Sequence, residues 1–333
     1  MQAAVFKAVG QPLLIEQIAD PTPVGRDVVI SVSRCGICGS DLHMTEDPAL
    51  HLPSGTVLGH EYAGEIVSTG PAVEQLRVGD RVVVVPIRSC GRCAECLAGK
   101  PGWCTAMRLE AGGYAQYSVA DERQCIRLPN SLSMPDGAIV EPLAVALHGV
   151  RLSGLVAGAK VLVIGAGAIG LAVAFWARRL GAGRIAMTDT LRSRGALAIE
   201  MGATCFVDPL DNGPEAVDRA LGGPPDIVFE AVGKPGLIAQ SIAQVRPRGT
   251  VVVLGICTSA DTFVPVVAVD KGIRIQCSAL YEIRDFEITI DTLEAGVVAP
   301  RHMVTDTVPL GDMPAAFEAL RHRTTQCKVL VHP

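Results

Sequence analysis

The chain contains eleven cysteines, and four of them lie close together as Cys90-x2-Cys93-x2-Cys96-x7-Cys104. Thiolates at this spacing can converge tetrahedrally on Zn²⁺, and four protein ligands leave no coordination position for a substrate. Four cysteines packed in a core would need apolar neighbours, but the residues between them include several polar ones. In a long chain without a secretory leader, metal binding is also more typical than disulfides. The spacing therefore predicts a structural zinc site.

A second set of candidate ligands comes from two glycine-flanked segments, residues 35–43 and 59–64. These segments contain Cys38 and His60, which could be two ligands of an open zinc site that keeps a position for substrate. Taken alone, a single histidine is more often a core or surface residue than a ligand. The hypothesis becomes specific only in combination with the four-cysteine cluster and with the glycine motif described next.

A GxGxxG motif formed by Gly165, Gly167 and Gly170 follows an apolar strand-like run and opens a helix-like stretch. The first glycine permits a tight turn, the second lets a pyrophosphate approach the backbone, and the third allows close packing of helix on strand. The helix N-terminus then offers free N–H groups to the phosphates. Asp189 ends the next predicted strand, where an acid accepts hydrogen bonds from ribose hydroxyls. The motif in this context predicts dinucleotide binding.

The same acid bears on which dinucleotide is bound. Asp189 repels a 2′-phosphate, so it favours NAD over NADP. Arg192 and Arg194 follow closely, however, and one of them could hold that phosphate instead of starting a solvated helix. We expect NAD, with NADP as the alternative.

The elements that must position these residues belong to two regions of the chain, which differ in their predicted secondary structure. Short β-type runs broken by Gly and Pro fill residues 1–147, and strands alternating with helices fill residues 148–283, which predicts a doubly wound parallel sheet. Residues 284–333 are expected to rejoin the first domain. The main predicted strands are Asp27–Ser33, Tyr62–Thr69, Arg81–Val85, Tyr114–Val119, Lys160–Ile164, Arg184–Asp189, Asp226–Glu230, Thr250–Leu254, Ile273–Cys277 and Lys328–Val331.

Composition narrows the class of protein further. The chain has 333 residues, of which 49% are hydrophobic and 19% charged, so it favours two folded domains and excludes disorder. The net charge of −5, without a run of basic residues, argues against a nucleic-acid partner. The longest uncharged run, Val161–Ala177, is shorter than the roughly 20 residues of a membrane span. With no signal peptide evident, we expect a cytoplasmic protein without a membrane partner.

Taken together, these motifs resemble the zinc-dependent alcohol dehydrogenases of the medium-chain dehydrogenase/reductase superfamily over essentially the full length. The pattern Gly59-His60-Glu61-x2-Gly64-x5-Gly70-x2-Val73 is similar to that family's zinc signature, and the run 140–148 is most similar to the polyol (sorbitol) and 2,3-butanediol dehydrogenase branch. The resemblance implies an α/β protein with a GroES-like β-rich catalytic domain and a Rossmann domain. It also implies a catalytic zinc at the cleft between them, in addition to the structural zinc.

Carried over onto this chain, the resemblance assigns roles to individual residues. Cys38 and His60 are expected to bind the catalytic zinc. The classical third cysteine is missing, because no cysteine lies between Ile126 and Thr204, and Glu141 is expected in its place, directly or through water. The alternative for Glu141 is that it only caps a helix together with Pro142.

The remaining assignments concern the neighbours of the metal and the cofactor. Glu61 is expected to be an outer or alternating ligand, and Asp41 to orient the His60 ring. Ser40 would contact the reacting oxygen, and His43 would end a proton relay to solvent. The expected cofactor contacts are Gly165, Gly167, Ile169, Gly170, Asp189, Arg194, Leu254, Gly255 and Ile256.

The resemblance therefore predicts a reversible, NAD(H)-dependent oxidation of a small alcohol, with a secondary alcohol or vicinal diol favoured by Glu141. Zinc lowers the pKa of a bound alcohol, and hydride passes to the nicotinamide. A homodimer or homotetramer is implied by the resemblance alone. Two alternatives are a zinc-free quinone-type reductase of the same superfamily and a non-catalytic NAD- or zinc-binding protein.

Overall fold

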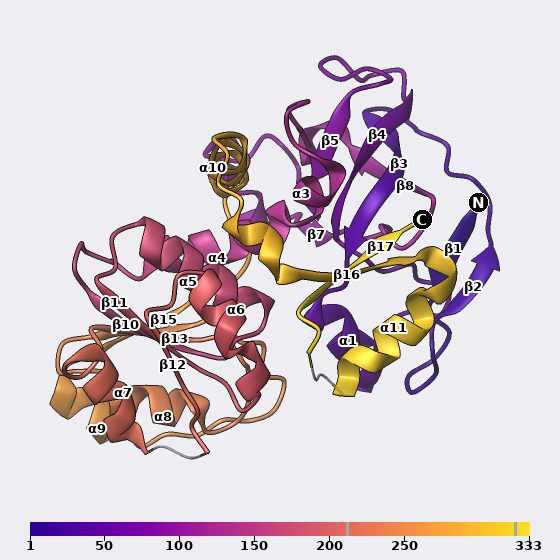
Figure 1. The fold of residues 1–333 in the computed structure, drawn as a ribbon. Coiled ribbons are helices and arrows are strands. Elements are labelled where there is room, and N and C mark those ends of the chain that lie inside the picture. The colour runs from indigo at the N-terminus through magenta and orange to yellow at the C-terminus, as the bar shows by residue number, and fades with distance from the viewer. Residues whose placement is uncertain (211–212, 323–324) are drawn as a thin grey trace. The chain divides into compact units, whose positions relative to one another are not determined.

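The computed structural model describes residues 1–210, 213–322 and 325–333, and the elements given below belong to this part of the chain (Figure 1). The chain divides into two compact units. We call them the β-rich unit, which comprises Met1–Glu141, Glu282–Val297 and Val304–Pro333, and the parallel-sheet unit, which comprises Pro142–Tyr281 and Val298–Met303.

These bounds differ from the expected ones at three places, the smallest being the second junction, which lies before Glu282 instead of before residue 284. The parallel-sheet unit already begins at Pro142, because the indole Nε1–H of Trp176 donates to the carbonyl of Leu143 at 2.9 Å and ties the start of the domain to its interior. Residues 298–303 also belong to the parallel-sheet unit, since they pack against the helices Ala168–Arg179 and Gly195–Glu200.

The β-rich unit is built around a seven-stranded sheet of order β16-β17-β3-β4-β5-β9, with β8 paired to β3. Two small antiparallel pairs, β1-β2 and β6-β7, flank it. Its strands are β1 Gln2–Val5, β2 Leu14–Gln17, β3 Asp27–Gly36, β4 Glu61–Thr69, β5 Arg81–Val84, β6 Ile87–Arg88, β7 Arg108–Leu109, β8 Tyr117–Asp121, β9 Cys125–Arg127, β16 Val304–Pro309 and β17 Lys328–His332. Its helices are α1 Gly39–Glu46, α2 Ala94–Leu97, α3 Met134–Ala138, α10 Ile283–Glu294 and α11 Met313–Ala319.

The core of the β-rich unit joins segments from both ends of the chain. Strand β17, close to the C-terminus, pairs antiparallel with β3, so that Leu330 lies opposite Gly36. The buried cluster beneath this sheet contains aliphatic side chains together with Tyr62, Tyr114 and Phe317. Burying such side chains is the main favourable contribution to folding. This core is what carries the loops at the ends of β3 and β4.

The parallel-sheet unit holds six parallel strands in the order β12-β11-β10-β13-β14-β15. Helices α5 and α6 cover one face of the sheet, and α7, α8 and α9 cover the other (Figure 1). The elements are β10 Lys160–Ile164, β11 Arg184–Thr188, β12 Cys205–Val207, β13 Ile227–Glu230, β14 Thr250–Val253, β15 Arg274–Cys277, α4 Val140–Leu152, α5 Ala168–Arg179, α6 Gly195–Glu200, α7 Pro214–Leu221, α8 Leu237–Gln244 and α9 Pro265–Lys271.

The predicted fold class is confirmed: one unit is β-rich and the other is a doubly wound parallel sheet. The strand order reverses between β10 and β13, and ligands of such sheets bind at the carboxyl ends of the strands on either side of the reversal. In the described part of the chain, no helix is both long enough and apolar enough to cross a membrane.

The predicted strand Tyr114–Val119 starts three residues too early, since β8 begins at Tyr117. The reason is that Tyr114 has other backbone partners. Its N–H donates to the Leu58 carbonyl at 3.0 Å, and its carbonyl accepts the N–H of Ala4 at 2.8 Å. This displaced tyrosine lies next to the candidate active site.

Candidate active site

The four-cysteine cluster forms from one short stretch of chain. The sulfurs of Cys90, Cys93, Cys96 and Cys104 all lie within 4.8 Å of one another. Cys93 precedes the short helix α2, and the Cys93 and Cys96 sulfurs are 3.4 Å apart. Backbone N–H groups that hydrogen-bond to the Cys90 sulfur lower its pKa to about 6, so this thiol is ready to ionise and bind a metal. Four converging sulfurs match the closed ligand set of a structural zinc.

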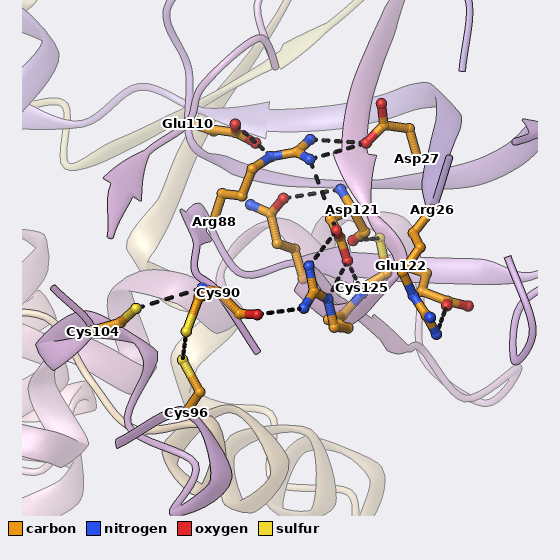
Figure 2. A network of polar contacts seen from close by, with 12 residues as sticks. Arg26, Asp27, Arg88, Cys90, Cys96, Cys104, Glu110, Asp121, Glu122 and Cys125 are labelled. Atoms are coloured by element: carbon orange, nitrogen blue, oxygen red, sulfur yellow. Dashed lines mark hydrogen bonds and ion pairs between the residues drawn. The ribbon is translucent and has the colours of Figure 1, made fainter. Parts of the chain in front are cut away.

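A polar network anchors this loop to the sheet (Figure 2). The carbonyl of Cys90 accepts a hydrogen bond from Arg123 Nη1 at 3.1 Å, and Arg123 is itself paired with Asp121 at 2.7 Å. Beside it, Arg88 contacts Asp27 at 3.0 Å and Glu110 at 2.6 Å. The cluster is therefore connected to strands of the main sheet through the backbone carbonyl of Cys90 and not through a sulfur.

The second group brings together Cys38, His60 and Glu61, whose ligand atoms lie within 4.8 Å of one another. Cys38 precedes helix α1, just after the end of β3, and Glu61 begins β4. The antiparallel register of these strands places Gly36 opposite Glu61, which brings the two loops to the same edge. A thiol, an imidazole and a carboxylate are the donor types that a catalytic zinc takes.

Asp41 connects helix α1 to the His60 ring. It is fully buried, and its Oδ1 lies 3.2 Å from His60 Nδ1. Burial by itself raises the pKa of Asp41, but His60, Tyr114 and the Cys38 N–H outweigh it and lower the pKa. Burial lowers the pKa of His60, but the nearby Asp41 and Cys38 raise it well above the ordinary value. Because Nδ1 faces the carboxylate, Nε2 is the ring nitrogen available to a metal.

Lys328, the first residue of β17, was not found by the sequence reasoning. Its Nζ lies 2.6 and 2.7 Å from the two carboxylate oxygens of Glu61, and both side chains are almost fully buried. Burial alone lowers the pKa of Lys328, but the facing carboxylate reverses this and raises it. A side chain on Gly36 would clash with the Glu61 carboxylate, so the glycine makes room for the pair. The sequence feature that could have identified Lys328 is a lysine at the start of an otherwise apolar terminal strand.

Helix α1 carries the two predicted relay residues. The Ser40 hydroxyl donates to the Cys38 sulfur at 3.2 Å, so it lies beside the group. His43 follows three residues later on the half-buried side of the same helix. Glu141 is buried in the first turn of α4, and within the described residues the group of close ligand atoms does not include it. The ligand role of Glu141 stays a prediction.

The glycine motif forms a turn between β10 and α5. Gly165 has a φ of 99°, which favours glycine, and a Cβ on Gly170 would lie 1.8 Å from the Gly165 carbonyl oxygen. Asp189 accepts from the N–H of Ala166 at 2.8 Å and from the N–H of Leu191 at 2.9 Å. Arg194 is buried here, since its Nη1 donates to the Ala166 carbonyl at 3.1 Å. Asp189 and Arg194 thus hold the loop at which the phosphates of the dinucleotide are expected to bind.

The other predicted cofactor contacts lie along the same sheet edge. Ile169 is half-buried in the first turn of α5, and Gly167 caps that helix. Leu254 and Gly255 follow β14, and both donate their N–H to the Glu230 carbonyl, at 2.8 and 3.0 Å. The neighbouring Ile256 is 55% exposed.

Glu230, at the carboxyl end of β13, was missed. It is buried, and its Oε1 accepts the N–H groups of Val232 and Gly233 at 2.8 and 2.9 Å. The sequence feature that could have identified Glu230 is an acidic residue at the end of an apolar strand next to the reversal of strand order. Its carboxylate shapes the loop that faces the glycine motif across the sheet edge.

Comparisons with known proteins agree with this geometry. Residues 25–130 match the alcohol dehydrogenase GroES-like domain, and residues 168–295 match the zinc-binding dehydrogenase family. The chain is 34% identical to D-xylulose reductase A of Aspergillus niger over 309 residues, which covers 89% of this chain and 86% of that protein.

Two solved structures extend the comparison. The 2R,3R-butanediol dehydrogenase from Bacillus subtilis superposes with a TM-score of 0.89 at 32% identity, covering 100% of this chain and 99% of that one. A dehydrogenase from Sinorhizobium meliloti 1021 bound to NADP superposes with a TM-score of 0.90 at 31% identity, with the same coverage.

The chain belongs to the zinc-binding alcohol dehydrogenases of the medium-chain dehydrogenase/reductase superfamily, and the relatives named above are polyol and diol dehydrogenases. It is an oxidoreductase of CH–OH groups. The two alternative functions, a zinc-free quinone-type reductase and a non-catalytic NAD- or zinc-binding protein, are not favoured. The two clusters fit zinc by the chemistry of their donors, one with four thiols and one with three different donor types.

Proposed function

We propose that this protein oxidises a secondary alcohol or vicinal diol reversibly, with NAD(H), at a catalytic zinc held by Cys38 and His60. The observation that carries the proposal is the convergence of Cys38, His60 and Glu61 at one edge of the β-rich sheet. The names of two relatives, a D-xylulose reductase and a butanediol dehydrogenase, support a polyol or diol substrate. The four-cysteine cluster would hold a second, structural zinc.

A bound zinc supplies Lewis-acid polarisation of the substrate oxygen. The residues around it then have separate tasks. Cys38 and His60 hold the ion, and Asp41 keeps Nδ1 of His60 protonated. The Ser40 hydroxyl, beside the Cys38 sulfur, would accept the proton of the substrate while releasing its own, and His43 would carry the released proton towards solvent. The loop around Gly165 and Asp189 binds the dinucleotide.

We assign the third zinc ligand to Glu141 and a supporting role to Glu61. Both carboxylate oxygens of Glu61 already accept from Lys328, so ligation by Glu61 would have to compete with a buried ion pair. Glu141 and Glu61 can be separated by counting zinc in Glu141→Gln and Glu61→Gln. We expect Glu141→Gln to weaken zinc binding more, and the opposite order would make Glu61 the ligand.

NAD is the proposed cofactor because the nearby arginines are engaged by acids. Arg192 pairs with Asp208 at 2.5 Å, and Arg194 lies 3.7 Å from Asp189. We expect Asp189→Gly to raise the KM for NAD about tenfold and to improve the use of NADP, since it removes the charge that repels a 2′-phosphate. Asp189→Asn, which keeps an acceptor for the loop, is the control. An unchanged preference in both variants would contradict the ribose contact.

The decisive test is steady-state reduction of NAD across primary, secondary, cyclic and polyol substrates, with zinc counted in the same sample. We expect two zinc ions per chain and the highest kcat/KM with a secondary alcohol or vicinal diol. Activity without the zinc at Cys38 and His60 would refute the proposed mechanism. A homodimer or homotetramer, which the family resemblance implies, remains a prediction, and so does a cytoplasmic location.

A further inference from the structure

Tyr114 brings a hydroxyl into the β-rich core beside the candidate zinc site. Its side chain is fully buried, and its ring contacts Phe317 edge-on with a centroid distance of 6.4 Å. The ring lies against Gly59, where a Cβ would come within 2.5 Å of it. Backbone hydrogen bonds to Leu58 and Ala4 hold the main chain of Tyr114 in place. These ring contacts and backbone hydrogen bonds together restrict where the hydroxyl can lie.

The hydroxyl of Tyr114 donates to Oδ2 of Asp41. The other oxygen of this carboxylate, Oδ1, faces Nδ1 of His60 at 3.2 Å. The remaining contact of Oδ2 is the backbone N–H of Cys38, at the longer distance of 3.3 Å. Each carboxylate oxygen thus has its own direction, one towards the tyrosine and one towards the histidine. Removing the hydroxyl would leave only the longer Cys38 N–H contact on Oδ2 to keep the carboxylate turned towards His60.

We propose that Tyr114 is a positioning residue of the catalytic zinc site, which holds Asp41 so that the His60 imidazole presents Nε2 to the metal. This inference rests on the proposed function. Groups that orient a metal-bound histidine set the basicity and direction of the ligand, and losing one typically costs 10- to 100-fold in metal affinity. The contribution of Tyr114 is therefore to zinc binding as well as to core packing.

Tyr62 provides a matched control within the same core. It is also almost fully buried, and its hydroxyl pairs with Ser118 Oγ at 3.0 Å. Tyr62→Phe and Tyr114→Phe each remove one hydroxyl from a buried ring and keep the ring. They differ in the partner that is left, a neutral serine in one variant and the Asp41 carboxylate in the other.

The experiment follows zinc transfer from each purified holoprotein to a chromogenic chelator, and records the visible spectrum after Co²⁺ replaces the more labile zinc. In Tyr114→Phe we expect one of the two zinc ions to be bound about tenfold more weakly and the Co²⁺ spectrum to change. Tyr62→Phe should match the wild type in both measurements, although both variants lose some thermal stability. Adding Tyr114→Phe to Asp41→Asn should produce no further loss of zinc affinity, because the two residues act through one contact.

Equal zinc binding and equal spectra in Tyr114→Phe and Tyr62→Phe would overturn the inference and leave the proposed function intact. If the wild type holds only one zinc, and Cys104→Ser removes it, the proposed function itself fails. Should Tyr114→Phe fold poorly, Tyr114→Met removes the hydroxyl while a flexible side chain fills the space, with the same expected results.

Discussion

The two candidate metal clusters are built from very different lengths of chain. Cys90, Cys93, Cys96 and Cys104 come from one loop, while Cys38, His60 and Glu61 come from the ends of two paired strands. In both clusters the ligand atoms lie within 4.8 Å of one another. The four-cysteine cluster can form from one turn and one short helix. The Cys38–His60–Glu61 group forms only when two strands pair in the correct register.

Their surroundings differ as much as their origins. The four-cysteine cluster is largely half-exposed, and backbone hydrogen bonds to its Cys90 sulfur favour the thiolate there. The Cys38–His60–Glu61 group is supported by buried charged side chains, Asp41 on one side and Lys328 on the other. The four-cysteine cluster is thus supported through its backbone, whereas the Cys38–His60–Glu61 group has buried charged neighbours that contact its ligands directly.

Cys38→Ser tests whether the Cys38–His60–Glu61 group, and not the four-cysteine cluster, is the catalytic site, and it has the largest expected effect. We expect turnover to fall by about three orders of magnitude or more, because the catalytic zinc loses its only thiolate. Zinc content should drop from two ions to one, and fluorescence titration should show that NADH binding by the parallel-sheet unit is retained. Retained activity would remove the metal from the mechanism.

Cys104→Ser tests the other cluster. Because the binding energy of a structural zinc contributes to folding, we expect a loss of about 2 kcal/mol or more in unfolding free energy. This corresponds to a decrease in Tm of about 4–8 °C. The kcat/KM of the folded protein should change little, and Cys277→Ser, at an exposed cysteine, should leave both quantities unchanged. A large loss of kcat/KM at unchanged Tm would show that this cluster is not structural.

The third prediction concerns the buried pair of Lys328 and Glu61. Lys328→Met leaves a buried carboxylate without its cation, and we expect unfolding by denaturant to require about 3 kcal/mol less. Glu61→Gln combined with Lys328→Met removes both charges and should recover part of this loss. Additive effects in the double-mutant cycle would show that the two side chains do not interact.

The sequence predicted those parts of the fold that depend on local patterns. The apolar run Lys160–Ile164 followed by Gly165 and Gly170 was enough to place β10, the turn and α5. The strand expected at Tyr114 was wrong at its start, because the backbone of Tyr114 pairs with Leu58 and Ala4 rather than with the sheet. Those partners are remote in sequence, and no periodicity within the strand indicates them.

The same division applies to the site. By itself the sequence predicted the four-cysteine cluster and the dinucleotide motif, because their spacing restricts what they can do, and the family resemblance pointed to Cys38, His60 and Asp41. Only the tertiary structure decided that Lys328, 267 residues after Glu61, pairs with it, and that Tyr114 meets Asp41. The physical reason is that these contacts depend on the pairing of β17 with β3 and of β3 with β4, and strand register is a property of the whole sheet.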